Sequence, residues 1–214
     1  MDRVGILLAN TGTPSAPHVK AVRSYLSEFL RDKHVVQLPA FLWLPLLYGM
    51  ILPFRPHRSA KLYQKIWTKE GSPLQVTMQK FPSLLQHALA NKTNSIIEIG
   101  MNYGTPSIGK ALQRLRAQEI NKLIVFPLYP QFSNVTTRST FDKVTMETKT
   151  WPNSPKIHFI QDYADHPTYI DILARSIQNK WSQEGEPGFR HHCYFIKCRS
   201  CCDIGKLGIK RKYN

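Results

Sequence analysis

The sequence predicts an α/β fold, in which a parallel β-sheet carries helices on both faces. Four short apolar runs have the composition of buried strands, at residues 4–9, 95–99, 122–126 and 156–160. Stretches with helical spacing separate these runs, and loops rich in turn-forming residues follow the first three. Strands that alternate with helices of this length form parallel sheets, because the return to a parallel strand has to cross the sheet.

The elements follow in a regular order. The turn-rich stretch 10–17 ends the first strand, and residues 18–31 then place their apolar side chains on one side of a helix. Further helices are predicted at about 57–67, 74–90, 107–117, 138–149 and 167–183. For the helix at 74–90, we expect Ser72 to be the N-cap and Pro73 to lie in the first turn.

The apolar segment from Phe41 to Leu52 leaves two interpretations open. It contains Pro45 and is too short for a membrane-spanning helix, which needs roughly 20 apolar residues. It is either a buried core helix or an exposed apolar lip at the mouth of a pocket or at a membrane surface. Arg55 and Arg58 follow the segment and would suit anionic headgroups.

Charge and cysteine content divide the chain into a body and a tail. The formal net charge is +15, of which residues 1–188 carry +9, so the body favours anionic partners. Residues 189–214 hold seven Lys or Arg against one acid, and all four cysteines as well. A body without cysteine and a start without a signal-peptide pattern predict a cytoplasmic protein, with peripheral membrane contact left open.

Ligands of parallel α/β sheets bind beyond the carboxyl ends of the strands, where loops and helix amino-termini converge. Three loops qualify here, at residues 10–17, 100–106 and 127–137. They are rich in small, hydroxyl-bearing or aromatic residues, and none holds a Walker or dinucleotide glycine pattern. This composition argues against a nucleotide enzyme.

Several motifs occur on this frame in a fixed order. They are Leu7–Pro14, Trp43–Leu47, Ile51–Arg55, Ala60–Tyr63, Ile66–Trp67, Gly71–Leu74, Gly100–Ser107, Phe126–Ser133 and Asp162–His166. With these motifs residues 3–187 resemble the amino-terminal half of ferrochelatase, and Leu-Tyr-Pro-Gln-Phe-Ser at 128–133 is the most specific of them. The resemblance implies a Rossmann- or flavodoxin-like chelatase domain, one of two in the family.

The domain boundaries expected from the resemblance are as follows. Residues 1–165 form the first chelatase domain, with the lip at about 40–56. Residues 166–188 form a helix that leads toward the second domain. Residues 189–214 form a basic, cysteine-rich tail that does not belong to the native fold.

The resemblance also implies a function. The family inserts Fe²⁺ into protoporphyrin IX in haem biosynthesis, and a flat tetrapyrrole lies in a cleft between the two domains. Ferrous iron is then a substrate, no cofactor is expected, and nucleic acid is not a partner. The substrate-binding residues carried over from the family's motifs are Thr11, Asn102, Tyr103, Tyr129, Ser133 and Thr136.

The roles implied for these residues differ. Tyr103 and Tyr129 would supply an aromatic wall and a hydroxyl, and Thr11 would face the metal side of the porphyrin. Asn102 stands where many relatives carry a positively charged residue.

Ser133 and Thr136 lie in a loop that enters a helix, where hydroxyls and free N–H groups suit a propionate. For each of the six residues the alternative is local turn capping. Arg138 occupies a position that a small residue usually fills, which puts the shape of this loop in question.

The catalytic groups implied by the resemblance are a histidine on the first strand of the second domain and a glutamate further on. Here the turn Gly185–Pro187 is present, but Arg190 to His192 interrupt the apolar strand that should follow, and Phe195 stands near the expected histidine. We therefore predict no catalytic or metal-binding residue in this chain, and expect a truncated or frameshifted form that is inactive alone. The alternatives are a porphyrin-binding module without catalysis, or a metal- or nucleic-acid-binding protein that acts through its tail.

Overall fold

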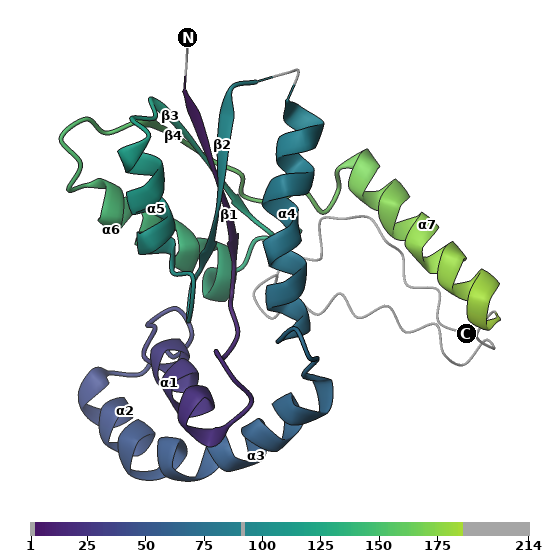
Figure 1. Cartoon of the computed structure of the whole chain (residues 1–214). Helices are drawn as coiled ribbons and strands as arrows, with labels where there is room; N and C mark the ends of the chain where they lie inside the picture. The colour runs from purple at the N-terminus through teal and green to yellow at the C-terminus, as the bar shows by residue number, and fades with distance from the viewer. Residues whose placement is uncertain (1–2, 91–92, 186–214) are drawn as a thin grey trace, which may run out of the picture. The chain divides into compact units, whose positions relative to one another are not determined.

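A computed structural model describes residues 3–90 and 93–185, so the tail predicted at 189–214 lies outside the described residues. The chain divides into two compact units, Met1–Asp162 and Tyr163–Asn214 (Figure 1). In the second unit, α7 (Pro167–Glu184) follows His166, whose side chain accepts a hydrogen bond from the backbone N–H of Thr168. The helix predicted at 167–183 is confirmed.

The first unit is built on a parallel sheet of four strands in the order β2-β1-β3-β4. The strands are β1 (Val4–Asn10), β2 (Ser95–Met101), β3 (Lys122–Pro127) and β4 (Lys156–Phe159). In the register of the sheet, Leu7 of β1 lies opposite Glu98 of β2 and Val125 of β3. The predicted α/β class with a parallel sheet is confirmed.

Helices cover both faces of this sheet, because successive side chains of a strand point to opposite sides. Leu7 and Val125 pack with Leu112 of α5 (Ile108–Ala117) and Val144 of α6 (Ser139–Thr148). On the other face, Leu8 belongs to a cluster with residues of α4 (Pro73–Leu89). Figure 1 shows α5 and α6 on one side of the strands and α4 on the other.

The start of α4 agrees with the sequence prediction in detail. Ser72 is the N-cap, its hydroxyl accepts a hydrogen bond from the backbone N–H of Gln75, and Pro73 is the first helical residue. A proline fits there because the first N–H groups of a helix have no partner within the helix.

A separate helical layer lies beyond the carboxyl ends of the strands (Figure 1). It consists of α1 (Val19–Leu30), α2 (Ala40–Leu46), the π-helical turn η1 (Leu47–Ile51) and α3 (Leu52–Ile66). Its core joins Val22, Leu26 and Leu30 of α1 to Leu47 and Leu52. α3 begins five residues before its predicted start, because η1 continues α2 directly into it and Pro53 falls in the first turn.

The apolar segment 41–52 is only partly buried. Leu47 and Leu52 are 0% and 4% exposed, whereas Phe41 and Met50 are 75% and 61% exposed. Phe54, just beyond the segment, is 72% exposed. Leu47 and Leu52 therefore anchor the segment, while side chains such as Phe41 and Met50 are exposed. This agrees with the interpretation of the segment as an exposed apolar lip. Among the described helices, none is both long and apolar enough to cross a bilayer.

Candidate functional site

The loops that follow β1 and β3 meet at the topological switch point of the sheet, where the direction in which the chain adds strands reverses. The chain leaves β1 toward β2 on one side of the sheet and leaves β3 toward β4 on the other, so ligands of such folds bind between these two loops. The hydroxyls of Thr11 and Tyr129 lie 2.8 Å apart here and are hydrogen-bonded. Two of the predicted site residues are thus brought together from distant parts of the chain.

The loop after β2 continues the pairing with β1 past the end of the sheet. The backbone N–H of Asn102 donates to the carbonyl of Asn10 at 2.8 Å, and that of Tyr103 donates to the carbonyl of Thr11 at 3.0 Å. Gly12 permits this approach, because its φ of 96° is in the left-handed region and a Cβ would lie 1.9 Å from the carbonyl oxygen of Tyr103. The Gly-Thr-Pro motif after the first strand therefore holds two loops in contact.

Asn102 and Tyr103 are turned into the interior, with 8% and 2% exposure. The side-chain oxygen of Asn102 accepts a hydrogen bond from the hydroxyl of Thr140 at 3.1 Å. The Tyr103 ring packs edge-on against Phe29 with 5.1 Å between ring centroids, and its hydroxyl donates to Asp32 at 2.8 Å. Both side chains bond protein groups in this arrangement, and a contact of either one with a ligand stays a prediction.

A buried polar junction, formed by Asp32, Tyr103, Ser139 and Lys143, was missed by the sequence analysis. The Asp32 carboxylate is 9% exposed and accepts hydrogen bonds from the hydroxyls of Tyr103 and, at 2.6 Å, Ser139. The Lys143 ammonium lies 3.8 Å from this carboxylate and 3.9 Å from the centre of the Tyr103 ring. It also donates to the carbonyl of Asn102 at 2.6 Å.

Burial and charge pairing set the pKa values of Asp32 and Lys143. Burial alone would raise the pKa of Asp32, but hydrogen bonds from Ser139, the His34 backbone and Tyr103 outweigh it and hold the pKa below its ordinary value. Burial lowers the pKa of Lys143, although the Asp32 charge opposes this. The carboxylate and the ammonium therefore compensate each other in a place where either alone would be costly.

The hydroxyls of Thr11, Tyr103 and Tyr129 stay protonated at neutral pH. Burial raises the pKa of Tyr129 and of Tyr103 well above the ordinary value of a phenol. Thr11 carries an alcohol, which does not ionise in the physiological range. At neutral pH Thr11, Tyr103 and Tyr129 therefore offer neutral hydrogen-bonding groups.

The loop after β3 enters α6 through a second π-helical turn, η2 (Asn134–Arg138). The carbonyl of Ser133 accepts hydrogen bonds from the backbone N–H groups of Thr136 and Arg138, while the Ser133 hydroxyl caps nothing. The Thr136 carbonyl accepts from the hydroxyl of Thr140 at 2.9 Å. The Arg138 side chain is exposed and pairs with Asp142 at 3.1 Å, which settles how this larger residue is accommodated.

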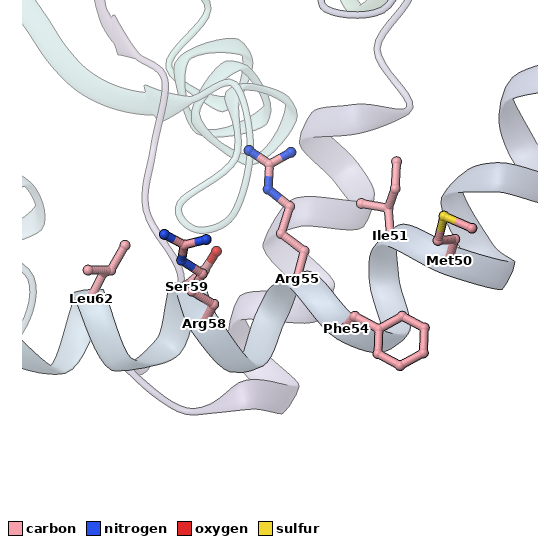
Figure 2. A pocket seen from close by; sticks show the side chains of 7 residues that line it. All are labelled: Met50, Ile51, Phe54, Arg55, Arg58, Ser59 and Leu62. Atoms are coloured by element: carbon pink, nitrogen blue, oxygen red, sulfur yellow. The ribbon is translucent and has the colours of Figure 1, made fainter.

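The lip forms a groove of about 690 Å³ on the first unit (Figure 2). Its lining is apolar except for two arginines and a serine, and comprises Met50, Ile51, Phe54, Arg55, Arg58, Ser59 and Leu62. Figure 2 shows Arg55 and Arg58 rising from the same side of α3, while the Phe54 ring points away from them. Within the described part of the chain, no carboxylate pairs with either arginine.

Groups of His, Cys, Asp or Glu side chains hold metal ions in proteins. No group of three or more His, Cys, Asp or Glu side chains among residues 3–90 and 93–185 is arranged to hold a metal ion. The cysteines considered for a metal site, Cys193 to Cys202, lie outside these ranges. The tail alternative is therefore not addressed by the structure.

The fold and the site define a class of protein, a parallel α/β domain whose loops after β1 and β3 meet at the carboxyl ends of the strands and which carries an arginine-lined apolar lip. The family model described as Ferrochelatase matches residues 3–195. The chain belongs to the ferrochelatase family, as its motifs indicated.

Proteins named ferrochelatase from several bacteria align with most of this chain. The protein of Photobacterium profundum is 46% identical over 188 residues, which cover 88% of this chain and 57% of the relative. That of Vibrio cholerae is 45% identical over 184 residues, with 86% and 56% covered. The protein of Hamiltonella defensa is 46% identical over 187 residues, with 87% and 57% covered. The chain thus spans little more than half the length of these relatives.

Proposed function

We propose that this chain supplies one wall of a tetrapyrrole-binding site, and that in a full-length family member this wall serves the insertion of Fe²⁺ into protoporphyrin IX during haem biosynthesis. The observation that carries the proposal is the lip groove, in which Arg55 and Arg58 stand unpaired beside apolar side chains among the described residues. Ferrous iron is a substrate in this account, and no resident cofactor is proposed.

The chemistry of the groove suits a flat apolar ring with anionic arms. Ile51, Met50 and Leu62 offer apolar surface for the macrocycle, and a volume of about 690 Å³ falls within the range of small-molecule sites. Guanidinium groups bind carboxylates with two parallel hydrogen bonds, so Arg55 and Arg58 are suited to the two propionates.

We propose further that this chain by itself binds porphyrin without inserting iron at an enzyme's pace. Two pyrrole N–H protons have to leave as the metal enters, and this step needs a base with a pKa near the working pH. Tyr129 cannot act as that base at neutral pH, because burial raises the pKa of its hydroxyl. The histidine and the glutamate that the family resemblance implies are expected outside residues 3–185.

Two measurements on the full chain test these proposals in turn. Titration of protoporphyrin with the protein should shift and sharpen the Soret band, with saturation at one porphyrin per chain. An anaerobic assay with Fe²⁺ and protoporphyrin should then give no iron insertion above the rate without protein. A flat Soret titration would refute the binding proposal, and insertion at a normal enzyme's rate would refute the second.

A matched pair of variants ties binding to the lip groove. The double variant Arg55→Gln/Arg58→Gln should lower the porphyrin affinity by about 30- to 140-fold, if each propionate contact contributes about 1–1.5 kcal/mol. The control Lys61→Gln/Lys65→Gln removes the same charge from exposed positions of α3 that do not line the groove. Equal losses in the two variants would point to general charge attraction instead of a site.

We also propose that the lip makes peripheral contact with an anionic membrane. Phe41, Met50 and Phe54 are largely exposed, and a second hollow of about 600 Å³ nearby is lined by Lys20, Arg23 and other residues. Apolar side chains flanked by cations are suited to the boundary between headgroups and acyl chains. Co-sedimentation with phosphatidylglycerol vesicles, and none with phosphatidylcholine vesicles, is expected; equal sedimentation with both, or with neither, would contradict the proposal.

A further inference from the structure

We infer that Asp32 is a positioning residue for the tetrapyrrole site, which acts through Tyr103 on the loop that carries Thr11. The inference rests on the proposed porphyrin-binding function for its ligand, and on the contacts of the polar junction for its geometry. Asp32 lies just after the end of α1, and its side chain is 9% exposed.

The first link joins Asp32 to two distant segments of the fold and to its own turn. One carboxylate oxygen accepts hydrogen bonds from the hydroxyls of Tyr103 and Ser139, at 2.8 and 2.6 Å. The other accepts the backbone N–H of His34 at 2.8 Å, which fixes the turn after α1. The carboxylate thus joins the end of α1 to the loop after β2 and to the start of α6.

The second link connects Tyr103 to the edge where the ligand is proposed to bind. The backbone N–H of Tyr103 donates to the carbonyl of Thr11, so a shift of Tyr103 has to move Thr11 or break this bond. The Thr11 hydroxyl in turn bonds that of Tyr129 at 2.8 Å.

Lys143 completes the arrangement from α6. Its ammonium donates to the carbonyl of Asn102, lies over the Tyr103 ring and is 3.8 Å from the Asp32 carboxylate, so it contacts the same loop and its acceptor. Removing the Asp32 carboxylate would leave this cation and two hydroxyls without their common acceptor. The loop would then relax toward other partners, and the proposed ligand edge would lose its fixed shape.

The test compares Asp32→Ala with Val144→Ala in the full chain. Val144 neighbours Lys143 on α6, is fully buried, and belongs to the core on the sheet side instead of to the junction. Hydrogen exchange at the amides of Asn102 and Tyr103 is the first readout, because both amides bond the chain after β1. We expect at least a fivefold faster exchange in Asp32→Ala and no change beyond the global loss of stability in Val144→Ala.

Porphyrin affinity is the second readout. Asp32→Ala should weaken porphyrin binding about fivefold, although the residue lies outside the groove. Because the effect passes through Thr11, Asp32→Ala should cause little further loss of affinity in a chain that already carries Thr11→Val. A purely structural role predicts that the two losses add. Tyr103→Phe removes only the hydroxyl and should reproduce a smaller part of both effects, which keeps the test decisive if Asp32→Ala does not fold.

The outcomes separate this inference from the proposed function. Unchanged amide exchange in Asp32→Ala and Tyr103→Phe would overturn the positioning role, whatever the porphyrin result. If the wild-type chain binds no porphyrin, the proposed function fails and the amide exchange alone decides whether Asp32 positions the loop. Additive losses of affinity would also overturn the inference.

Discussion

The polar junction and the lip groove lie in the same unit of the protein but differ in where their polar groups find partners. In the junction, Asp32, Tyr103 and Ser139 direct their polar groups to one another. In the lip, Arg55 and Arg58 stand open beside exposed apolar side chains. A buried group has to be satisfied by the protein, whereas an unsatisfied surface group is available to a ligand. The comparison separates the junction, whose polar groups hold three segments of the fold together, from the lip groove, whose arginines are open to a proposed ligand.

Gly12→Ala should have the largest effect on the free energy of unfolding, because the added methyl group would force apart the loops after β1 and β2. The new Cβ would lie 1.9 Å from the carbonyl oxygen of Tyr103, at a φ that side chains rarely adopt. We expect a loss of about 3 kcal/mol or more in urea unfolding. Gly49→Ala in the lip is the control, since nothing lies within 4 Å of its Cβ, and it should be neutral or slightly stabilising.

A pair of variants within the lip separates its anchor from its exposed surface. Leu47 is fully buried, so Leu47→Ala should cost about 2–4 kcal/mol of unfolding free energy. Phe54 is 72% exposed, so Phe54→Ala should change it by about 0.5 kcal/mol or less. Similar losses in the two variants would show that the lip is packed against something else, and would contradict the description of its outer side as open.

Asp32→Asn should cost about 1.5–3 kcal/mol at neutral pH, because hydrogen bonds to a charged acceptor are lost or weakened. The pKa of Asp32 is lowered by folding, so its stabilisation is present above the ordinary carboxyl pKa and is lost as the pH falls through the folded value. The loss caused by Asp32→Asn should therefore shrink below about pH 4, as measured by urea unfolding across pH.

Asp171→Asn on α7 is the control for the Asp32 variant. Asp171 forms a surface ion pair with Arg175 and is 56% exposed, so its removal should cost no more than about 0.5 kcal/mol at any pH. A loss at Asp32 that stayed constant down to pH 2 would contradict the charged state assigned to it.

The sequence was sufficient for the strands because each is a short apolar run, and for most helices because their apolar residues recur with helical spacing. Leu7 and Leu8 face opposite sides of the sheet, as a strand with helices on both faces requires, and Ser72 with Pro73 marks a helix start chemically. The lip could not be resolved in this way, because Leu47 and Leu52 are buried while the similar apolar side chains between them are not. Only the position of α1 decides which side chains of the segment are covered.

The polar junction was beyond the reach of the sequence for a related reason. Asp32 and Lys143 are 111 residues apart, and each stands among charged residues typical of a solvated surface. The motif around Tyr103 drew attention to its ring as part of a pocket, while its hydroxyl serves the junction. Such contacts depend on the tertiary arrangement of α1, α6 and the loop after β2, which no local pattern encodes.

The central claim is that Arg55 and Arg58 in the lip groove recognise the acidic arms of a tetrapyrrole, and a comparison of two ligands tests it most directly. Deuteroporphyrin and its dimethyl ester share the macrocycle but differ in their two carboxylates, so their affinities can be compared by Soret titration under the same conditions. The wild-type chain should bind the acid at least tenfold more tightly than the ester, and Arg55→Gln/Arg58→Gln should bind the two about equally. Equal affinity of the wild-type chain for both ligands would contradict the account.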